Sequence, residues 1–94
     1  MNLTKTIIEL ANAYNETIWH NYASCFKEVI VDRDGLDVVP RDILNVLIAL
    51  LGVEQTSVWI NKKISDLDNN SVIELVNNDI GRKAVKMFVL SMPN

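Results

Sequence analysis

The side chains that could perform chemistry are few and lie far apart in the sequence. His20 is the single histidine and Cys25 the single cysteine, and neither has a second ligand at a metal-binding spacing. A nucleophilic cysteine needs a basic neighbour, and the sequence specifies none for Cys25. Because Cys25 shares a helical stripe with Tyr22 and Val29, we expect a small buried hydrophobe there, and a half-exposed helix residue at His20.

The acidic residues are equally poor candidates for catalysis or metal binding. Asp32, Asp34 and Gly35 resemble the start of a calcium loop, but residues 38–40 are Val, Val and Pro, which supply no side-chain oxygens. Other aspartates have the spacing of turn and cap residues: Asp66, Asp68 and Asp79. The three glycines are isolated, so a phosphate-cradling loop is not expected. The sequence therefore predicts a protein that is not an enzyme and has no catalytic residue, metal or cofactor.

Composition indicates one globular domain. The chain has 94 residues, of which 49% are hydrophobic, and a formal net charge of −3, which disfavours unassisted nucleic-acid binding. From Arg82 onward the charged residues are cationic, which indicates either a handle for a partner or complementation of a helix dipole. No signal peptide is apparent, and the apolar stretch 46–53 is too short to span a membrane, so we expect a cytoplasmic protein.

Hydrophobic periodicity predicts helices along most of the chain. Residues 3–31 show steps of three and four, which predicts either one long helix or two helices in near-continuity that meet near Tyr14 and Asn15. A loop at 32–35 precedes a helix from Arg41 to Leu51, capped by Gly52, and its nearly all-apolar surface places it in the centre of the bundle.

The rest of the chain continues this pattern. Another helix is expected within 53–63, a capped short helix after Ser71-Val72-Ile73-Glu74, and a last helix over 80–91 that Pro93 ends. In that last helix Met87 and Phe88 are expected to face inward, while Val85, Val89 and Met92 could cover either core or partner. The prediction is an all-α, single-domain helical bundle of about five helices over residues 1–94, with an N-terminal helical region at 1–36 and the remainder at 37–94.

Two features of the middle of the chain bear on binding. Residues 49–53 followed by Val58 and Trp59 resemble a helix-turn-helix, whose second helix would direct four polar side chains toward DNA: Gln55, Ser57, Asn61 and Lys62. Glu54 would then lie close to phosphates, which weakens that interpretation. Trp59 is expected to be a core residue or, where exposed, an anchor for a partner.

The C-terminal half resembles a known family. The order Trp59-Ile60-Asn61, Leu67-Asp68, Ser71-Val72-Ile73-Glu74-Leu75, Gly81-Arg82 and Val85 is similar to the toxin-binding domain of Xre/MbcA/ParS-type antitoxins, over about residues 50–92. In this chain Asp68-Asn69 replaces a usual glycine, which is tolerable because Asp and Asn adopt left-handed geometry. Val72 replaces a usual proline at the first helical position.

That resemblance implies a bacterial antitoxin that binds a toxin, commonly a RES-type, NAD-consuming one, and covers its active site. It implies that Trp59, Leu67, Ser71, Glu74 and Gly81 mainly shape the domain. The partner-binding residues would then be Arg82, Lys83, Lys86, Met92, Pro93 and Asn94. Two alternatives stay open: a helix-turn-helix transcriptional regulator, and a stand-alone mobile-element inhibitor of a host defence protein. The sequence also leaves open whether the chain forms a homodimer.

Overall fold

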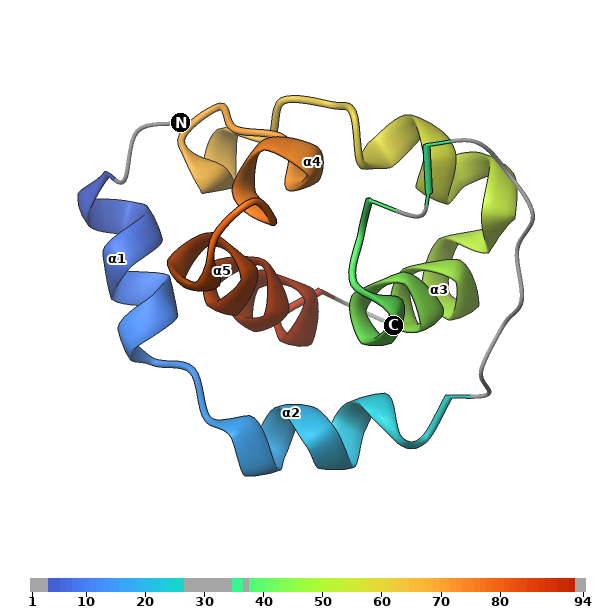
Figure 1. The fold of residues 1–94 in the computed structure, drawn as a ribbon, viewed down its shortest axis with the longest axis horizontal. Helices are drawn as coiled ribbons and strands as arrows, with labels where there is room; N and C mark the ends of the chain where they lie inside the picture. The colour runs from blue at the N-terminus through green and yellow to red at the C-terminus, as the bar shows by residue number, and fades with distance from the viewer. Residues whose placement is uncertain (1–3, 27–34, 37, 93–94) are drawn as a thin grey trace.

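The computed structural model describes residues 4–26, 35–36 and 38–92. These residues form five α-helices and one short 3-10 helix: α1 Lys5–Asn12, α2 Glu16–Ala23, α3 Arg41–Trp59, η1 Ser65–Leu67, α4 Val72–Leu75 and α5 Asp79–Leu90. The predicted all-α class and the number of helices are confirmed. Figure 1 shows α5 near the middle of the molecule, with α1, α2 and α4 arranged around it.

The N-terminal helices are two short segments that meet near Tyr14 and Asn15, the second of the two arrangements that the sequence left open. The Thr4 side chain accepts a hydrogen bond from the Ile7 amide and begins α1, and the Asn15 side chain accepts one from the Ile18 amide and begins α2. α1 ends at Asn12 with Ala13 as its C-cap, and Asn15 starts the second helix because its side chain serves as the N-cap. α1 packs mainly against α5, while α2 contacts both α3 and α5.

α3 consists of two helical segments that Gly52 separates. Gly52 has φ 82° and ψ 163°, a backbone conformation that is essentially restricted to glycine. Within the described residues α3 is the one helix long and apolar enough to cross a membrane. The break leaves segments 41–51 and 53–59, each well below the roughly 20 residues that a span requires. The second segment ends at Trp59, earlier than Lys63 in the predicted range.

The chain from Ile64 to Arg82 contains η1, α4 and the first turn of α5. We call this segment the α4–α5 corner. Asp68 and Asn69 adopt left-handed backbone conformations with φ of 53° and 61°, the geometry that the sequence expects these two residue types to tolerate. The capping box at Ser71 and Glu74 is present in full, and the Asn78 side chain accepts a hydrogen bond from the Gly81 amide at 2.7 Å to begin α5.

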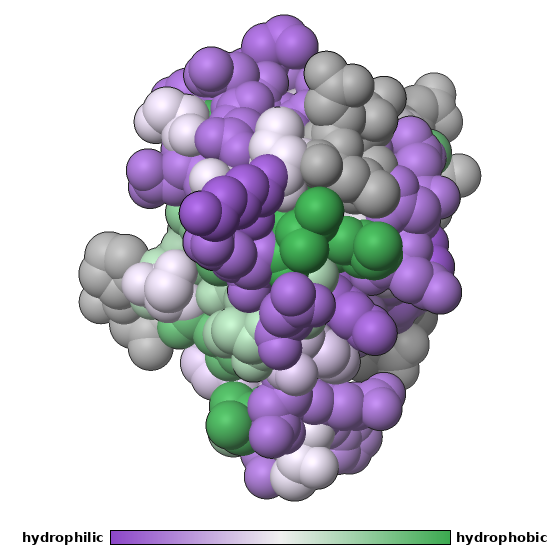
Figure 2. All heavy atoms as spheres, turned by 90° about the vertical axis from the view of Figure 1, so that its left-hand side faces the viewer, coloured by the Kyte–Doolittle hydropathy of each residue, from purple (hydrophilic) through white to green (hydrophobic). Residues whose placement is uncertain are grey.

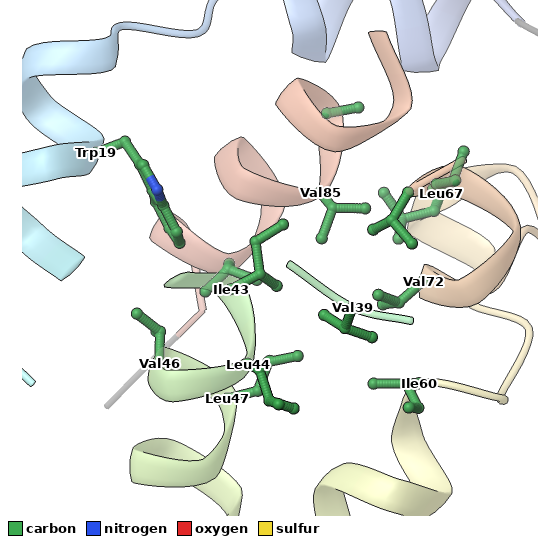
Figure 3. Close-up of a cluster of buried hydrophobic side chains, with 14 of the residues drawn as sticks. Trp19, Val39, Ile43, Leu44, Val46, Leu47, Ile60, Leu67, Val72 and Val85 are labelled. Atoms are coloured by element: carbon green, nitrogen blue, oxygen red, sulfur yellow. The ribbon is translucent and has the colours of Figure 1, made fainter. Parts of the chain in front are cut away.

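The hydrophobic core joins α5 to every other α-helix. Figure 3 shows part of this cluster, with Val85 of α5 between Ile43 of α3 and Leu67 of η1. The core also contains residues from the loop before α3, since Leu36 and Val39 are buried. Burial of this apolar surface is the main term that stabilises the fold.

Two predictions about the core are wrong. The segment 41–51 is not the centre of the bundle, because Ile48, Leu50 and Leu51 are only partly buried, while α5 contacts α1, α2 and α4. On α5 the inward residues are Val85 and Val89, which are fully buried, together with Gly81 and Ala84; Met87 and Phe88 are half-buried and Ile80 is exposed. The helical period gives α5 two apolar stripes. Which of the two stripes is buried depends on how α5 packs against the other helices.

Candidate functional site

Trp59 lies where α3 ends, at the edge of the core. Its ring is half-buried and stacks on Phe88 of α5, with ring centroids 6.1 Å apart and an interplanar angle of 12°. Val58, the preceding residue, is 65% exposed. We call these three residues, Val58, Trp59 and Phe88, the Trp59 surface. Trp59 thus packs against the core cluster and is still partly exposed, and its role as an anchor for a partner stays a prediction.

α3 ends at Trp59, and the backbone at this end of the helix is held in place by the following part of the chain. Ile60 is buried and serves as the C-cap of α3, and its carbonyl accepts a hydrogen bond from the Ile73 amide at 3.2 Å. The α4–α5 corner thus holds the end of α3 through the backbone. A tryptophan on a fixed backbone loses little conformational freedom on binding, which favours it as an anchor.

The three cations predicted to contact a partner have different surroundings. Arg82 is half-buried, forms an ion pair with Asp79, and donates a hydrogen bond from Nη1 to the Val76 carbonyl at 3.0 Å. That contact satisfies the C-terminal end of α4, so Arg82 joins α4 to α5. Lys83 is exposed. Lys86 is largely buried, with its side chain only 18% exposed. The basic residues of α5 therefore do not form one free patch.

The end of the chain gives a mixed result for the predicted partner-binding residues. Met92 is half-buried and packs against the core cluster. Pro93 and Asn94 lie outside the described residues, as do Asp32 and Asp34 of the calcium-loop comparison and the predicted helix end at Pro93.

Lys86 lies beside a surface pocket of about 310 Å³, which we call the Lys86 pocket. Its walls come from the α1–α2 junction, α2 and the residues just after it, the start of α3, and α5. The lining residues are Tyr14, Glu16, Trp19, His20, Ala23, Ser24, Phe26, Asp42, Asn45 and Lys86. Sequence reasoning missed this pocket because its members come from four separate elements.

A polar network crosses the floor of the Lys86 pocket. The Trp19 indole Nε1–H donates a hydrogen bond to Oδ2 of Asp42 at 2.8 Å, and Lys86 Nζ lies 3.5 Å from the same oxygen. Lys86 Nζ also lies 5.3 Å from the Tyr14 ring centroid and 5.8 Å from the Trp19 ring centroid. Both distances are within the range of cation–π attraction. One ammonium group is thus held by two rings and a carboxylate.

His20 and Cys25 are both on the surface. His20 is exposed and lines the Lys86 pocket. The prediction that Cys25 is buried is wrong: the residue is exposed, and its thiol donates to the Asn21 carbonyl at 3.4 Å. α2 ends at Ala23, so the helical period that placed Cys25 on the Tyr22 stripe no longer applies. Among the described residues, no group of three or more His, Cys, Asp or Glu side chains is placed to hold a metal ion.

The four residues expected to face DNA lie along one short segment. Gln55, Asn61 and Lys62 are exposed, and Ser57 is half-buried with its hydroxyl donating to the Glu54 carbonyl at 2.8 Å. The Asn61 side chain donates to the Ser57 carbonyl at 3.0 Å. Lys62 is the one cation of the set and Glu54 is exposed in the same segment, so the charge balance gives little attraction for phosphate.

The ionisable group with the clearest local perturbation is Glu74. Hydrogen bonds from the Ser71 hydroxyl and then the Ser71 backbone amide hold the pKa of the Glu74 carboxyl below its ordinary value, and Lys63 at 3.5 Å adds a smaller effect in the same direction. The cause is the capping box, so this shift reports on the structure of the corner and not on catalysis.

Exposed apolar residues on the α1 side of the molecule do not form a continuous surface. Figure 2 shows that face, where hydrophobic side chains lie in separate spots between hydrophilic ones. Single exposed apolar residues such as Ile8, at 40% exposure, are ordinary on protein surfaces. We therefore assign no function to this face.

Comparison of the chain with protein-family models, with curated proteins and with solved structures finds no match. The likeness of residues 50–92 to antitoxin domains therefore rests on the motif residues themselves and stays a prediction.

Proposed function

We propose that this chain is a small non-catalytic protein-binding protein that acts in the manner of an antitoxin, in the cytoplasm, by covering the active site of a partner enzyme. The observation that carries this proposal is the Trp59 surface. It combines a fixed, partly exposed tryptophan with the most exposed of the large hydrophobic side chains that the structure describes, Val58. Partly exposed aromatic residues on rigid elements are the usual anchors of protein interfaces.

This surface agrees with the family resemblance in one respect and differs from it in another. Phe88 lies on α5, the helix that the resemblance assigns to toxin contact, whereas the resemblance gives Trp59 mainly a role in shaping the domain. The resemblance implies that three cations contact the partner, but Arg82 and Lys86 form contacts within the chain. Lys83 is exposed. We therefore centre the proposed interface on Val58, Trp59 and Phe88, with Lys83 as its charged component.

The best test uses surface substitutions. Deleting residues 82–94 would remove the buried side chains of Val85 and Val89, so loss of binding would only report loss of the fold. Val58→Asp instead places a charge on the Trp59 surface without touching the core. The matched control is Ile18→Asp, since Ile18 is 57% exposed on α2, across the molecule from the end of α3 (Figure 1).

The measurement is capture of the product of the neighbouring gene by the purified chain, followed by assay of that product's activity, including NAD consumption. We expect native protein and Ile18→Asp to bind and inhibit it, and Val58→Asp to lose binding about 100-fold, as expected for a charge in a hydrophobic anchor site. Equal binding by Val58→Asp would place the interface elsewhere. A neighbouring product that none of the three proteins binds would reject the antitoxin role.

DNA binding is the less supported alternative. The exposed side chains of Gln55, Asn61 and Lys62 follow the Gly52 break, which is the arrangement the helix-turn-helix prediction requires. A gel shift with the chain's own promoter that weakens steeply with salt would favour it over the protein-binding proposal.

A further inference from the structure

The Trp59 surface has an unused hydrogen-bond donor. The indole N–H of Trp19 donates to Asp42 at 2.8 Å, whereas none of the described residues accepts a hydrogen bond from the indole N–H of Trp59. Over the same described ranges, Thr56 Oγ1 is the one buried side-chain nitrogen or oxygen that lacks a partner, so the Trp59 nitrogen is in contact with solvent. A partner that covers this edge of the ring must therefore supply an acceptor, because a buried indole N–H without one is costly.

The backbone turn after α3 places Lys62 on the same side of the chain as the Trp59 ring. In this turn the amides of Asn61 and Lys62 donate to the carbonyls of Val58 and Trp59, at 3.2 Å and 3.0 Å. Side chains three residues apart eclipse each other in such a turn, so Lys62 follows the direction of Trp59 and Asn61 that of Val58. Lys62 is exposed, and no carboxylate in the described part of the chain forms an ion pair with it. Its ammonium group is thus a second unused donor beside the ring.

The charges around this end of α3 favour a negatively charged partner. Residues 55–65 contain two cations, Lys62 and Lys63, and no aspartate or glutamate. Lys63 already pairs with a carboxylate of α4 at 3.5 Å, which leaves Lys62 as the cation of this segment that a partner can use. Glu54 lies one helical turn before Val58, so the two ends of the surface carry opposite charges. A bound segment is therefore expected to place its acidic groups at the Lys62 end.

We propose that the Trp59 surface binds an acidic amphipathic segment of the protein partner. Apolar side chains of that segment contact Val58 and the Trp59 ring, and its aspartate or glutamate carboxylates accept from Lys62 and from the indole N–H. This inference rests on the proposed protein-binding function, states the chemistry of the partner, and adds Lys62 to Lys83 as a charged component of the interface. The phosphates of DNA carry the same charge, but they offer no apolar contact to Val58, which is 65% exposed.

The test uses two short amphipathic peptides that share one leucine stripe, flanked by glutamates in the first peptide and by lysines in the second. A short DNA duplex is the third probe. Two-dimensional N–H NMR spectra of the full chain report the indole signal of Trp59 and that of Trp19, whose N–H is already bonded to Asp42. We expect the glutamate peptide to shift the Trp59 signal saturably while the Trp19 signal stays in place. It should bind about fivefold more tightly than the lysine peptide, because an exposed ion pair is replaced by repulsion.

A pair of charge variants makes this test specific. Lys62→Gln should weaken binding of the glutamate peptide about threefold, the loss expected for an exposed ion pair. Lys5→Gln removes the same charge from an exposed position on α1, away from the end of α3 (Figure 1), and should leave binding unchanged. Equal affinity for the two peptides, an unaltered affinity in Lys62→Gln, an absent Trp59 shift, or tighter binding of the DNA duplex would each overturn the inference. The peptide titrations do not use the neighbouring gene product, so their failure leaves the Val58→Asp test of the proposed function intact.

Discussion

The α4–α5 corner and the Lys86 pocket are held together in different ways. In the corner the capping contacts join residues close in sequence: Ser71 with Glu74, Asn78 with Gly81, and Arg82 with Val76, three to six positions apart. Two further contacts, Thr4 with Asp68 and Ile60 with Ile73, attach the corner to the start of α1 and the end of α3. In the Lys86 pocket Trp19 and Asp42 are 23 positions apart, and Lys86 comes from the last helix. Local sequence therefore specifies the corner, whereas the pocket exists only after the helices have packed.

This contrast has a consequence for stability. A change in the corner should act on backbone geometry and should be felt throughout the core, because η1, α4 and α5 meet there. A change in the pocket should act on side-chain contacts between helices that are otherwise held by apolar packing. Substitutions of graded severity can test whether the two regions differ in this way.

Gly81→Ala should have the largest effect. A Cβ atom at Gly81 would lie 1.8 Å from the Leu75 carbonyl oxygen, so backbone would have to move apart. We expect a loss of about 3 kcal/mol in the free energy of unfolding, or failure to fold. Urea denaturation measures it, with Lys83→Ala at an exposed position of the same helix as the control. A loss below about 0.5 kcal/mol would show that the corner is not tightly packed.

Asp42→Ala tests the pocket side of the comparison. It removes the acceptor of the buried Trp19 indole and the ion pair of Lys86, which we expect to cost about 2 kcal/mol. The matched control is Asp79→Ala, which removes an exposed acid from the first turn of α5 and should cost about 0.5 kcal/mol. Equal losses in urea denaturation would mean that the network at Asp42 adds nothing beyond a helix-end charge.

Ser71→Ala should cost less, about 1 kcal/mol, as for other N-cap serines. The variant loses the hydroxyl that accepts from the Glu74 amide at 3.2 Å and donates to the Glu74 carboxylate at 3.0 Å. Thermal or urea unfolding measures the change, and the exposed Ser91 at the end of α5 provides a serine-to-alanine control. A Ser71→Ala protein as stable as the native chain would show that packing alone forms α4.

The smallest effect is expected in the pH dependence. Because the pKa of Glu74 is lowered in the folded protein, its contribution to stability is present above its ordinary value of 4.5 and is lost as pH falls through the lowered pKa. Comparing urea unfolding of the native chain and Glu74→Gln should therefore show a stability gap at neutral pH that closes on acidification. A gap that is constant with pH would mean that the charged carboxylate adds nothing to the capping box.

The contrast also explains which predictions succeeded. The capping box and the helix end at Gly52 follow from residue types and their local spacing, and both are confirmed. Asp68 and Asn69 adopt the left-handed geometry that their residue types tolerate, and the N-cap at Asn15 selects two N-terminal helices over one. The exposure of Cys25, the central place of α5 and the inward stripe at Val85 and Val89 depend on which helices meet. Periodicity gives a helix several apolar faces and does not state which neighbour each one meets.

The candidate sites divide in the same way. Trp59 could be proposed from the sequence because a tryptophan is a conspicuous anchor residue. The Lys86 pocket could not, since Asp42, Asn45 and Lys86 join the lining residues of segment 14–26 only through the packing of α3 and α5 against α2. The sequence also predicts that Arg82, Lys83 and Lys86 all contact a partner, although each of them has different surroundings in the fold.

The backbone conformation of Gly52 determines whether an L- or a D-amino acid is better accommodated at position 52. Its φ of 82° and ψ of 163° are unfavourable for an L-amino acid, yet no atom lies within 4 Å of where a Cβ would be placed. The mirror-image residue, D-alanine, prefers positive φ, so this backbone conformation would not strain it. A chain assembled by chemical ligation with D-alanine at position 52 should be more stable than the native chain by about 0.5 kcal/mol, because the unfolded state loses freedom that glycine keeps. L-alanine at the same position should be less stable than the native chain, and unfolding of the two diastereomers in urea would measure the difference.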